Sequence, residues 1–252
     1  MRRTSIDLNA DVGEGCGQDA ALFPLISSAN IACGYHAGDL YSMREALALA
    51  RDHGVAAGAH PSFPDREHFG RREMHLSAEA LHECIAAQLA SLAEIAARER
   101  VRVLHVKPHG ALYNMAARSE DLAEAVARAV AGVDPELALF GLAGSRLLAA
   151  GARLGLRTVS EAFADRGYRS DGTLLPRDQP GSVLHDEVEV ARRAVAMVSN
   201  GAVLAADGRL VALQADTICI HGDTPGAAVM AGRIREALAA SGVSIAAPQF
   251  RR

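Results

Sequence analysis

The sequence has no tryptophan, few other aromatic residues and no long apolar run, and each shortage narrows the possibilities. Aromatic residues make up 4% of the 252 residues, so alanine, valine and leucine must fill the interior. No apolar stretch reaches bilayer length, and none follows the basic start, so we expect neither a transmembrane helix nor a signal peptide. The formal net charge of -4 gives no general attraction to nucleic acid or to anionic membranes.

Paired cysteines and glycine-rich nucleotide motifs are also missing. The 4 cysteines show no paired spacing, which argues against a zinc knuckle and suits a reducing cytosol, so we expect a cytoplasmic protein. No G-x-G-x-x-G or Walker-type loop is present, so we expect no dinucleotide or Walker-type ATP site in this chain. Lysine is nearly absent: of 26 basic residues, 25 are arginine and one is Lys107. A compact cation with a tunable pKa therefore occurs at a single position.

Short β-type runs alternate with helical stretches along the whole chain, which predicts a parallel sheet. We therefore predict an α/β fold in which residues 1–252 form one irregular seven-stranded (β/α) barrel of the TIM-barrel type. An open doubly wound sheet is the alternative, and periodicity does not exclude it. The predicted strands are 4–9, 28–32, 55–60, 101–107, 137–142, 156–161 and 217–221.

Several helix boundaries can be predicted from capping residues. Asp39 can begin a helix that Gly54 ends, and Ser119 can begin another. Thr224 followed by Pro225 is typical of the start of a final helix. Two segments interrupt the alternation, and they are predicted to be a long loop at 162–185 and a hairpin at 203–214.

Polar residues recur at every second position at the ends of four predicted strands. Period two places each set on one face of its strand, and the intervening apolar residues face the helices. A barrel lined in this way is polar toward the C-terminal ends of its strands, where barrel active sites lie. The sets are Asp7, Asn9 and Asp11; His105, Lys107 and His109; Glu161, Phe163 and Asp165; and His221 and Asp223.

Four histidines (His36, His60, His109 and His221) each lie at a predicted strand end. One such histidine is usually a hydrogen-bonded structural residue, but four at one level favour function. Asp11, His36 and His60 could bind a divalent metal ion, because carboxylate and imidazole groups are its usual catalytic ligands. A metal-free acid/base cluster is an equal alternative.

Two further features could bind an anion. The loop at 61–75 contains Arg71 and Arg72, which can clamp a carboxylate or phosphate or can simply be surface charges. Asp223 precedes the final helix, whose first N–H groups form either an anion site or an ordinary cap.

Six motifs occur in a fixed order: DLNADVGE from Asp7, NIACGYHAGD from Asn30, AHPSFPD from Ala59, HVKPHGALYN from His105, EAFADR from Glu161 and CIHGDTP from Cys219. Together they cover nearly the whole chain, and they closely resemble the LamB/YcsF family. The resemblance implies a seven-stranded barrel related to the glycoside hydrolase/deacetylase superfamily. Members include the A subunit of bacterial 5-oxoprolinase, which implies ATP as co-substrate, 5-oxoproline as substrate and two partner subunits, B and C.

These motifs yield a predicted site. We predict that Asp11, His36, Lys107 and His109 are its catalytic centre, with Lys107 stabilising negative charge; a structural ion pair of Lys107 with Asp7, Asp11 or Glu161 is the alternative. A stand-alone metal-dependent amidohydrolase or deacetylase would share the fold and the cluster but need neither ATP nor partners. A binding module is disfavoured, because it has little use for a lysine and several histidines together. The predicted substrate-binding residues are Asn9, Asn30, His60, Arg71, Arg72, Tyr113, Asn114, Asp165, Arg166, His221 and Asp223.

Overall fold

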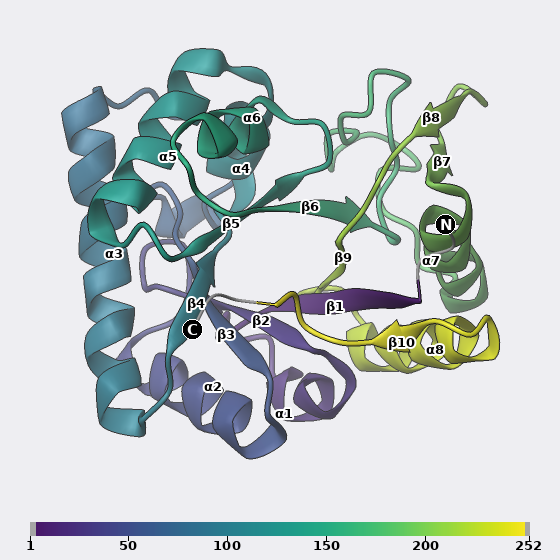
Figure 1. Cartoon of the computed structure of the whole chain (residues 1–252), viewed down its shortest axis with the longest axis horizontal. Coiled ribbons are helices and arrows are strands. Elements are labelled where there is room, and N and C mark those ends of the chain that lie inside the picture. Colours follow the sequence, from purple (N-terminus) through teal and green to yellow (C-terminus); the bar gives the residue numbers. More distant parts are fainter. Residues whose placement is uncertain (1–3, 250–252) are drawn as a thin grey trace.

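Seven parallel strands form a closed barrel in the computed structural model, which describes residues 4–249 (Figure 1). Each strand pairs with the next around the ring, and pairing of the first with the last closes it. The predicted seven-stranded (β/α) barrel is therefore confirmed, and the open sheet is wrong. The strands are β1 (Ser5–Val12), β2 (Ser28–Ala32), β3 (Ala56–His60), β4 (Val103–Val106), β5 (Ala138–Leu142), β6 (Thr158–Phe163) and β9 (Thr217–His221).

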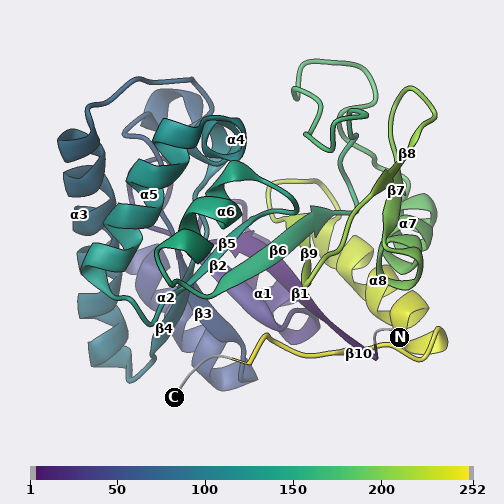
Figure 2. The ribbon, with the colours of Figure 1, turned by 45° about the horizontal axis from the view of Figure 1, so that its top comes forward.

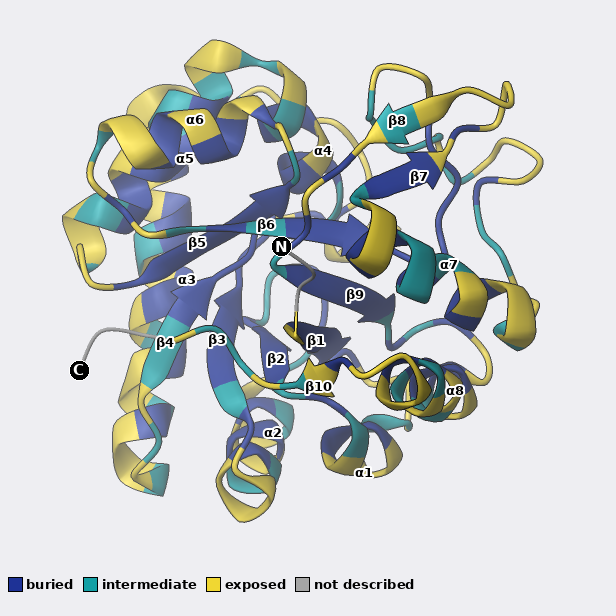
Figure 3. Cartoon of the chain, turned by 45° about the vertical axis from the view of Figure 1, so that its right-hand side comes forward, coloured by how far each residue is buried: buried dark blue, intermediate teal, exposed yellow. Residues whose placement is uncertain are grey.

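Helices surround the barrel and turn their exposed faces outward (Figure 3). Two short 3-10 turns, Phe23–Leu25 and Arg66–His68, lie in the connections after β1 and β3. Within residues 4–249, no helix has the length and apolar character needed to cross a bilayer. The helices are α1 (Asp19–Leu22), α2 (Leu40–His53), α3 (Ala78–Glu99), α4 (Gly110–Arg118), α5 (Glu120–Val133), α6 (Arg146–Arg153), α7 (Glu187–Asn200) and α8 (Ala227–Ala240).

Most predicted helix boundaries are confirmed by their caps. Asp39 accepts hydrogen bonds from the first turn of α2, and Gly54 ends that helix in the left-handed conformation, with φ of 66°. Ser119 caps α5 in the same way as Asp39 caps α2. The prediction for the last helix is wrong by two residues, because α8 is capped by Gly226 and not by Thr224.

The two interruptions form a separate part of the molecule beside β6 and β9 (Figure 2). The predicted hairpin is confirmed as β7 (Ala202–Leu204) and β8 (Leu210–Ala212), which are antiparallel. The predicted loop follows β6 and folds on itself through isolated bridges, one of them between Arg166 and Val183. The N–H of Ala206 donates to the carbonyl of Tyr168, which fixes the hairpin to this loop. A short strand, β10 (Ser244–Ile245), extends the sheet beside the start of β1.

The barrel wall separates an apolar layer from a polar interior. Ile6, Leu8 and Ala10 of β1 are buried in the main apolar core, while Asp7 and the other period-two residues of this strand are buried polar groups. β1 runs to Val12, three residues past its predicted end, so the whole polar set lies on a regular strand. The fold therefore positions the polar sets of β1, β4, β6 and β9 toward one interior.

Candidate active site

Asp7, the first of the polar residues on β1, is buried and accepts hydrogen bonds from three hydroxyl groups. Ser27 and Ser28 donate to its Oδ1 at 2.6 and 2.8 Å, and Thr217 donates to its Oδ2 at 2.6 Å. Burial raises the pKa of the Asp7 carboxyl to about 6, despite these hydroxyl donors. Asp7 thus closes the lower end of the interior.

Above Asp7, amide and imidazole groups form a network in which donors meet acceptors. Asn9 Nδ2 donates to Glu161 Oε1 at 2.9 Å, and Asn30 Nδ2 donates to Asn9 Oδ1 at 2.7 Å and to Asp11 Oδ1 at 2.9 Å. His105 Nε2 is 2.9 Å from Asn30 Oδ1. We call Asp7, Asn9, Asn30 and His105 the lower layer. Asn9 and Asn30 support the site from below and do not line its pocket.

A glycine makes room for the lower layer. A Cβ at Gly58 on β3 would lie 2.1 Å from His105 Nε2, closer than atoms can approach. The His105 ring also stacks on Phe140 of β5, with centroids 4.2 Å apart. Gly58 on β3 therefore leaves space for the His105 ring, and Phe140 on β5 packs against its face.

Lys107 lies between two carboxylates at the bottom of the pocket. Its Nζ is 2.8 Å from Asp11 Oδ1 and 3.0 Å from Glu161 Oε1, and 3.0 Å from Cys219 Sγ. Burial acts to lower the pKa of Lys107, but the charges led by Asp11 outweigh it and raise that pKa well above the usual value. The ammonium is therefore charged and paired, as in the structural ion pair that the sequence left open as an alternative. Lys107 nevertheless lines the pocket.

Three predicted histidines converge with a glutamate that the sequence analysis did not assign. We call Glu14, His36, His60 and His109 the mouth cluster; the ligand atoms of all four lie within 4.8 Å of one another. His36 Nε2 is 3.1 Å from Glu14 Oε1, and the rings of His36 and His109 stack with centroids 3.8 Å apart. Burial, together with the nearby charge of Asp11, raises the pKa of Glu14 well above its usual value. Imidazole and carboxylate groups at this spacing fit a divalent metal ion.

The fourth strand-end histidine forms a separate pair. His221 Nδ1 is 2.9 Å from Asp165 Oδ2, and the ring of His221 stacks on Phe163 at 5.2 Å. The other oxygen of Asp165, Oδ1, has no hydrogen-bond partner in the structure as described for residues 4–249. His221 lines the same pocket as Lys107 and His109, so the predicted strand ends do meet at one mouth.

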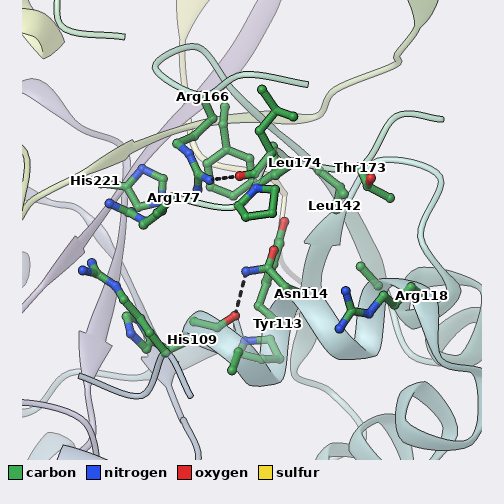
Figure 4. Close-up of a pocket in the computed structure, with 18 of the residues that line it drawn as sticks. His109, Tyr113, Asn114, Arg118, Leu142, Arg166, Thr173, Leu174, Arg177 and His221 are labelled. Atoms are coloured by element: carbon green, nitrogen blue, oxygen red, sulfur yellow. Dashed lines mark hydrogen bonds between the residues drawn. The ribbon is translucent and has the colours of Figure 1, made fainter. Parts of the chain in front are cut away.

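The pocket above these groups has a volume of about 490 Å³ and is rich in arginine (Figure 4). Arg71 forms an ion pair with Asp223 and lies over the ring of Phe69. Arg177, from the long loop, is 3.7 Å from the same Asp223. The loop at 61–75 thus contributes to the mouth through Arg71. Cavities of this size hold small organic ligands.

Arg166 differs from the other arginines because it is buried without a carboxylate partner. Its guanidinium donates to the carbonyl groups of Ser182 at 2.9 Å and Leu175 at 2.7 Å, and among residues 4–249 no carboxylate forms an ion pair with it. Burial and the charge of Arg177 lower the pKa of Arg166 to about 10. A buried guanidinium that remains charged favours an anionic ligand in the adjoining pocket.

Not every predicted substrate-binding residue reaches the pocket. Arg72 is exposed, and its guanidinium is 3.6 Å from Asp65 Oδ1, outside the pocket. Tyr113 and Asn114 line the pocket from α4, where the Tyr113 hydroxyl donates to Glu161 at 2.8 Å. Arg177 was missed, although its place in a charged loop after a strand was an available signal.

The chain is similar to a known protein family and to a solved structure. The model of the LamB/YcsF family matches residues 6–251. The chain belongs to the LamB/YcsF family. A crystal structure of the Lactam Utilization Protein from Thermus thermophilus is 47% identical, with a TM-score of 0.90, and the match covers 97% of this chain and 100% of that one.

Other solved structures have much lower sequence identities and TM-scores. A family 4 carbohydrate esterase from Streptomyces lividans is 13% identical with a TM-score of 0.49, over 96% of this chain and 91% of that one. A family 39 glycoside hydrolase from Bacteroides cellulosilyticus is 11% identical with a TM-score of 0.47, over 91% and 64%. Similarity at this level bears on neither substrate nor mechanism, so the relation to deacetylases stays a prediction.

Proposed function

We propose that this chain is the A subunit of an ATP-dependent 5-oxoprolinase, which opens the lactam ring of 5-oxo-L-proline to give L-glutamate. Membership of the LamB/YcsF family and 47% identity to a lactam utilization protein over nearly the full length of both chains support a lactam as substrate. One observation carries the proposal: Lys107, five arginines and His221, which is paired with Asp165, all adjoin a single pocket. Such a pocket offers both anion binding and proton transfer.

The reaction needs activation because resonance makes a lactam a poor electrophile. Transfer of the terminal phosphoryl group of ATP to the lactam oxygen would give ADP and a phosphorylated imidate. Water can then add to the carbon, the C–N bond breaks, and the ring nitrogen takes up a proton to become the amine. A second water releases phosphate from the resulting acyl phosphate. Both the substrate carboxylate and the phosphoryl group need cations.

Different residues of the pocket can supply the cations and the general base that this reaction requires. Arg166 and Arg71 are positioned to bind the carboxylate or the phosphoryl group, and Lys107, with Asp11, adjoins the site where negative charge develops. Because Asp165 accepts a hydrogen bond from Nδ1 of His221, Nε2 of the neutral ring keeps its lone pair and can act as a general base. A divalent metal ion bound by the mouth cluster would supply a Lewis acid or an activated water.

Partner subunits complete this proposal. The sequence has no Walker-type phosphate loop, so we infer that the B and C subunits of the enzyme provide or complete the ATP site. The chain on its own would then consume no ATP. We also propose a cytoplasmic location, where ATP is available.

Reconstitution tests the proposed function. The chain is purified alone and together with the two neighbouring gene products, and 5-oxoproline-dependent ADP and glutamate formation are measured. We expect both products only in the complete mixture, with the surface variant His53→Ala as an active control. Hydrolysis of 5-oxoproline by the single chain without ATP would instead support a stand-alone, metal-dependent amidohydrolase, which the mouth cluster also suits.

A further inference from the structure

The protonation of His60 follows from its hydrogen bond. Nδ1 of His60 is 2.7 Å from the carbonyl oxygen of Lys107. A carbonyl oxygen can only accept, so Nδ1 must carry the hydrogen. In a neutral ring, Nε2 of His60 then carries a lone pair. This lone pair points toward the other residues of the mouth cluster rather than toward a hydrogen-bond donor.

In His109 the roles of the two ring nitrogens are exchanged. Nε2 of His109 is 2.8 Å from the carbonyl oxygen of Phe69. Nε2 therefore carries the hydrogen, and Nδ1 of the neutral ring carries a lone pair. Nδ1 of His109 is 3.0 Å from Nε2 of His60. Two imidazole lone pairs therefore face each other at hydrogen-bonding distance.

Carboxylate oxygens surround these two nitrogens. Glu14 Oε1 is 3.5 Å from His109 Nδ1 and 4.0 Å from His60 Nε2, and Asp11 Oδ2 is 3.3 Å from His60 Nε2. All four side chains are buried. Without a proton between them, these four acceptor atoms repel one another, and a cation bound among them would remove that repulsion.

We propose that Glu14, His60 and His109 bind a divalent transition-metal ion of the zinc type. Ligand atoms about 2.0–2.2 Å from such an ion lie roughly 3.3 Å from one another in a tetrahedral site, and the separations of 3.0, 3.5 and 4.0 Å surround this value. The backbone carbonyl groups that fix both ring tautomers are the usual outer partners of metal-binding histidines.

Charge balance favours a divalent ion over a proton. Asp11 and Glu161 flank the ammonium of Lys107, and Glu14 lies beside His109. Arg71 is paired with Asp223. When Glu14 is ionised, three carboxylates and one ammonium leave an excess of two negative charges, which one divalent ion neutralises. A proton would satisfy one pair of acceptors and leave the others facing each other.

His36 is a positioning residue and not a ligand. Its ring is stacked parallel to that of His109, with 6° between the planes, and an ion in the plane of one stacked ring lies outside the plane of the other. His36 Nε2 can instead donate to Glu14 Oε1 at 3.1 Å, which orients the carboxylate. Such outer partners change metal affinity by about 10–100-fold.

Metal binding to the purified chain tests the proposal without lactam, ATP or partners, so its failure is separate from failure of the proposed function. The protein is stripped with a chelator and titrated with ZnCl₂ by calorimetry, and Co²⁺ absorption reports the coordination. We expect one ion per chain. Glu14→Gln and His109→Gln should each weaken binding by at least about 100-fold, His36→Asn by about 10–100-fold, and the exposed His53→Ala not at all.

Other outcomes overturn the proposal. The absence of saturable binding of one Zn²⁺ to the wild-type chain would mean that protons hold the cluster together. Binding that survives Glu14→Gln and His109→Gln but is lost in Cys219→Ser would place the ion at the neighbouring group of Asp11, Cys219 and His221. Circular dichroism verifies folding, and Glu14→Gln, which keeps the side-chain shape, serves if His109→Gln does not fold.

Discussion

The lower layer and the mouth cluster are both largely buried polar groups in the same barrel, yet their hydrogen bonding differs. In the lower layer, Asn9 and Asn30 donate to carboxylate and carbonyl oxygens that need donors. In the mouth cluster, lone pairs of His60 and His109 face each other and the carboxylate of Glu14. Burial alone therefore does not identify a functional group. A surplus of acceptors does, because a bound ligand or added protons must satisfy it.

The largest effect that separates activity from stability is expected at His221. His221→Asn keeps a hydrogen bond to Asp165 but removes the basic nitrogen, so turnover of the assembled enzyme should fall about 100- to 10,000-fold. Since His221 is at the mouth, the midpoint of urea unfolding should stay close to that of the wild type. Unchanged turnover per folded molecule would show that the base lies elsewhere.

Lys107 connects the two regions, and its removal should cost both activity and stability. Lys107→Met leaves Asp11 and Glu161 without their buried cation, which typically costs about 3–5 kcal/mol of unfolding free energy. The sequence favoured a catalytic Lys107 over a structural ion pair, and the observed ion pairs add an expected loss of stability. Arg98→Met, at an exposed pair with Glu94, should cost about 0–1 kcal/mol. If urea titrations showed an equally small loss of unfolding free energy for both variants, Lys107 would not be structural.

The lower layer should show a pH-dependent stability that comes from Asp7. Its pKa is about 6 in the folded chain and near 3.8 in the unfolded one, so the folded state holds a proton that the unfolded state has lost. The contribution is complete below about pH 4 and disappears as the pH rises through 6, about 3 kcal/mol in total. Asp7→Asn should lack it. Subtracting urea unfolding curves of variant and wild type between about pH 4.5 and 7 isolates the effect, with Asp52→Asn as exposed control.

The smallest effect has the opposite sign. In metal-free protein at a pH where Glu14 is ionised, Glu14→Gln replaces a buried acceptor by a group that can donate to His109 Nδ1, so the variant should be more stable by about 1–2 kcal/mol. It gains stability while losing metal. A destabilised, metal-free Glu14→Gln protein would mean that the mouth cluster is already satisfied by protons, as the lower layer is by its own donors.

Much of this contrast could be predicted from the sequence. Period-two polar residues placed Asp11 and Lys107 on inward faces, although β1 was predicted to end at residue 9 because its polar residues resemble a loop. Glu14 was missed since Gly13 and Gly15 flank it like a surface turn; Gly13, with φ of 72°, redirects the chain after β1. The tautomers of His60 and His109 depend on the carbonyl groups of Lys107 and Phe69, which lie in other segments of the chain, and no sequence pattern reveals them.

Arg71 and Arg72 illustrate a second limit. Both were predicted to bind substrate, and nothing in the sequence distinguishes them. Only the first reaches the pocket, because the loop folds over Gly70, whose carbonyl accepts a hydrogen bond from Ala111. A Cβ at Gly70 would lie 2.9 Å from both the His36 and His109 side chains, so this close packing decides which arginine faces inward.

Anomalous X-ray diffraction at the zinc edge would test most directly whether the surplus of acceptors at the mouth marks a metal site. Crystals of the chain grown with Zn²⁺ should show one strong peak about 2.0–2.2 Å from Glu14, His60 and His109, and none in the lower layer. A cluster without a peak, or a peak only among Asp11, Cys219 and His221, would contradict it.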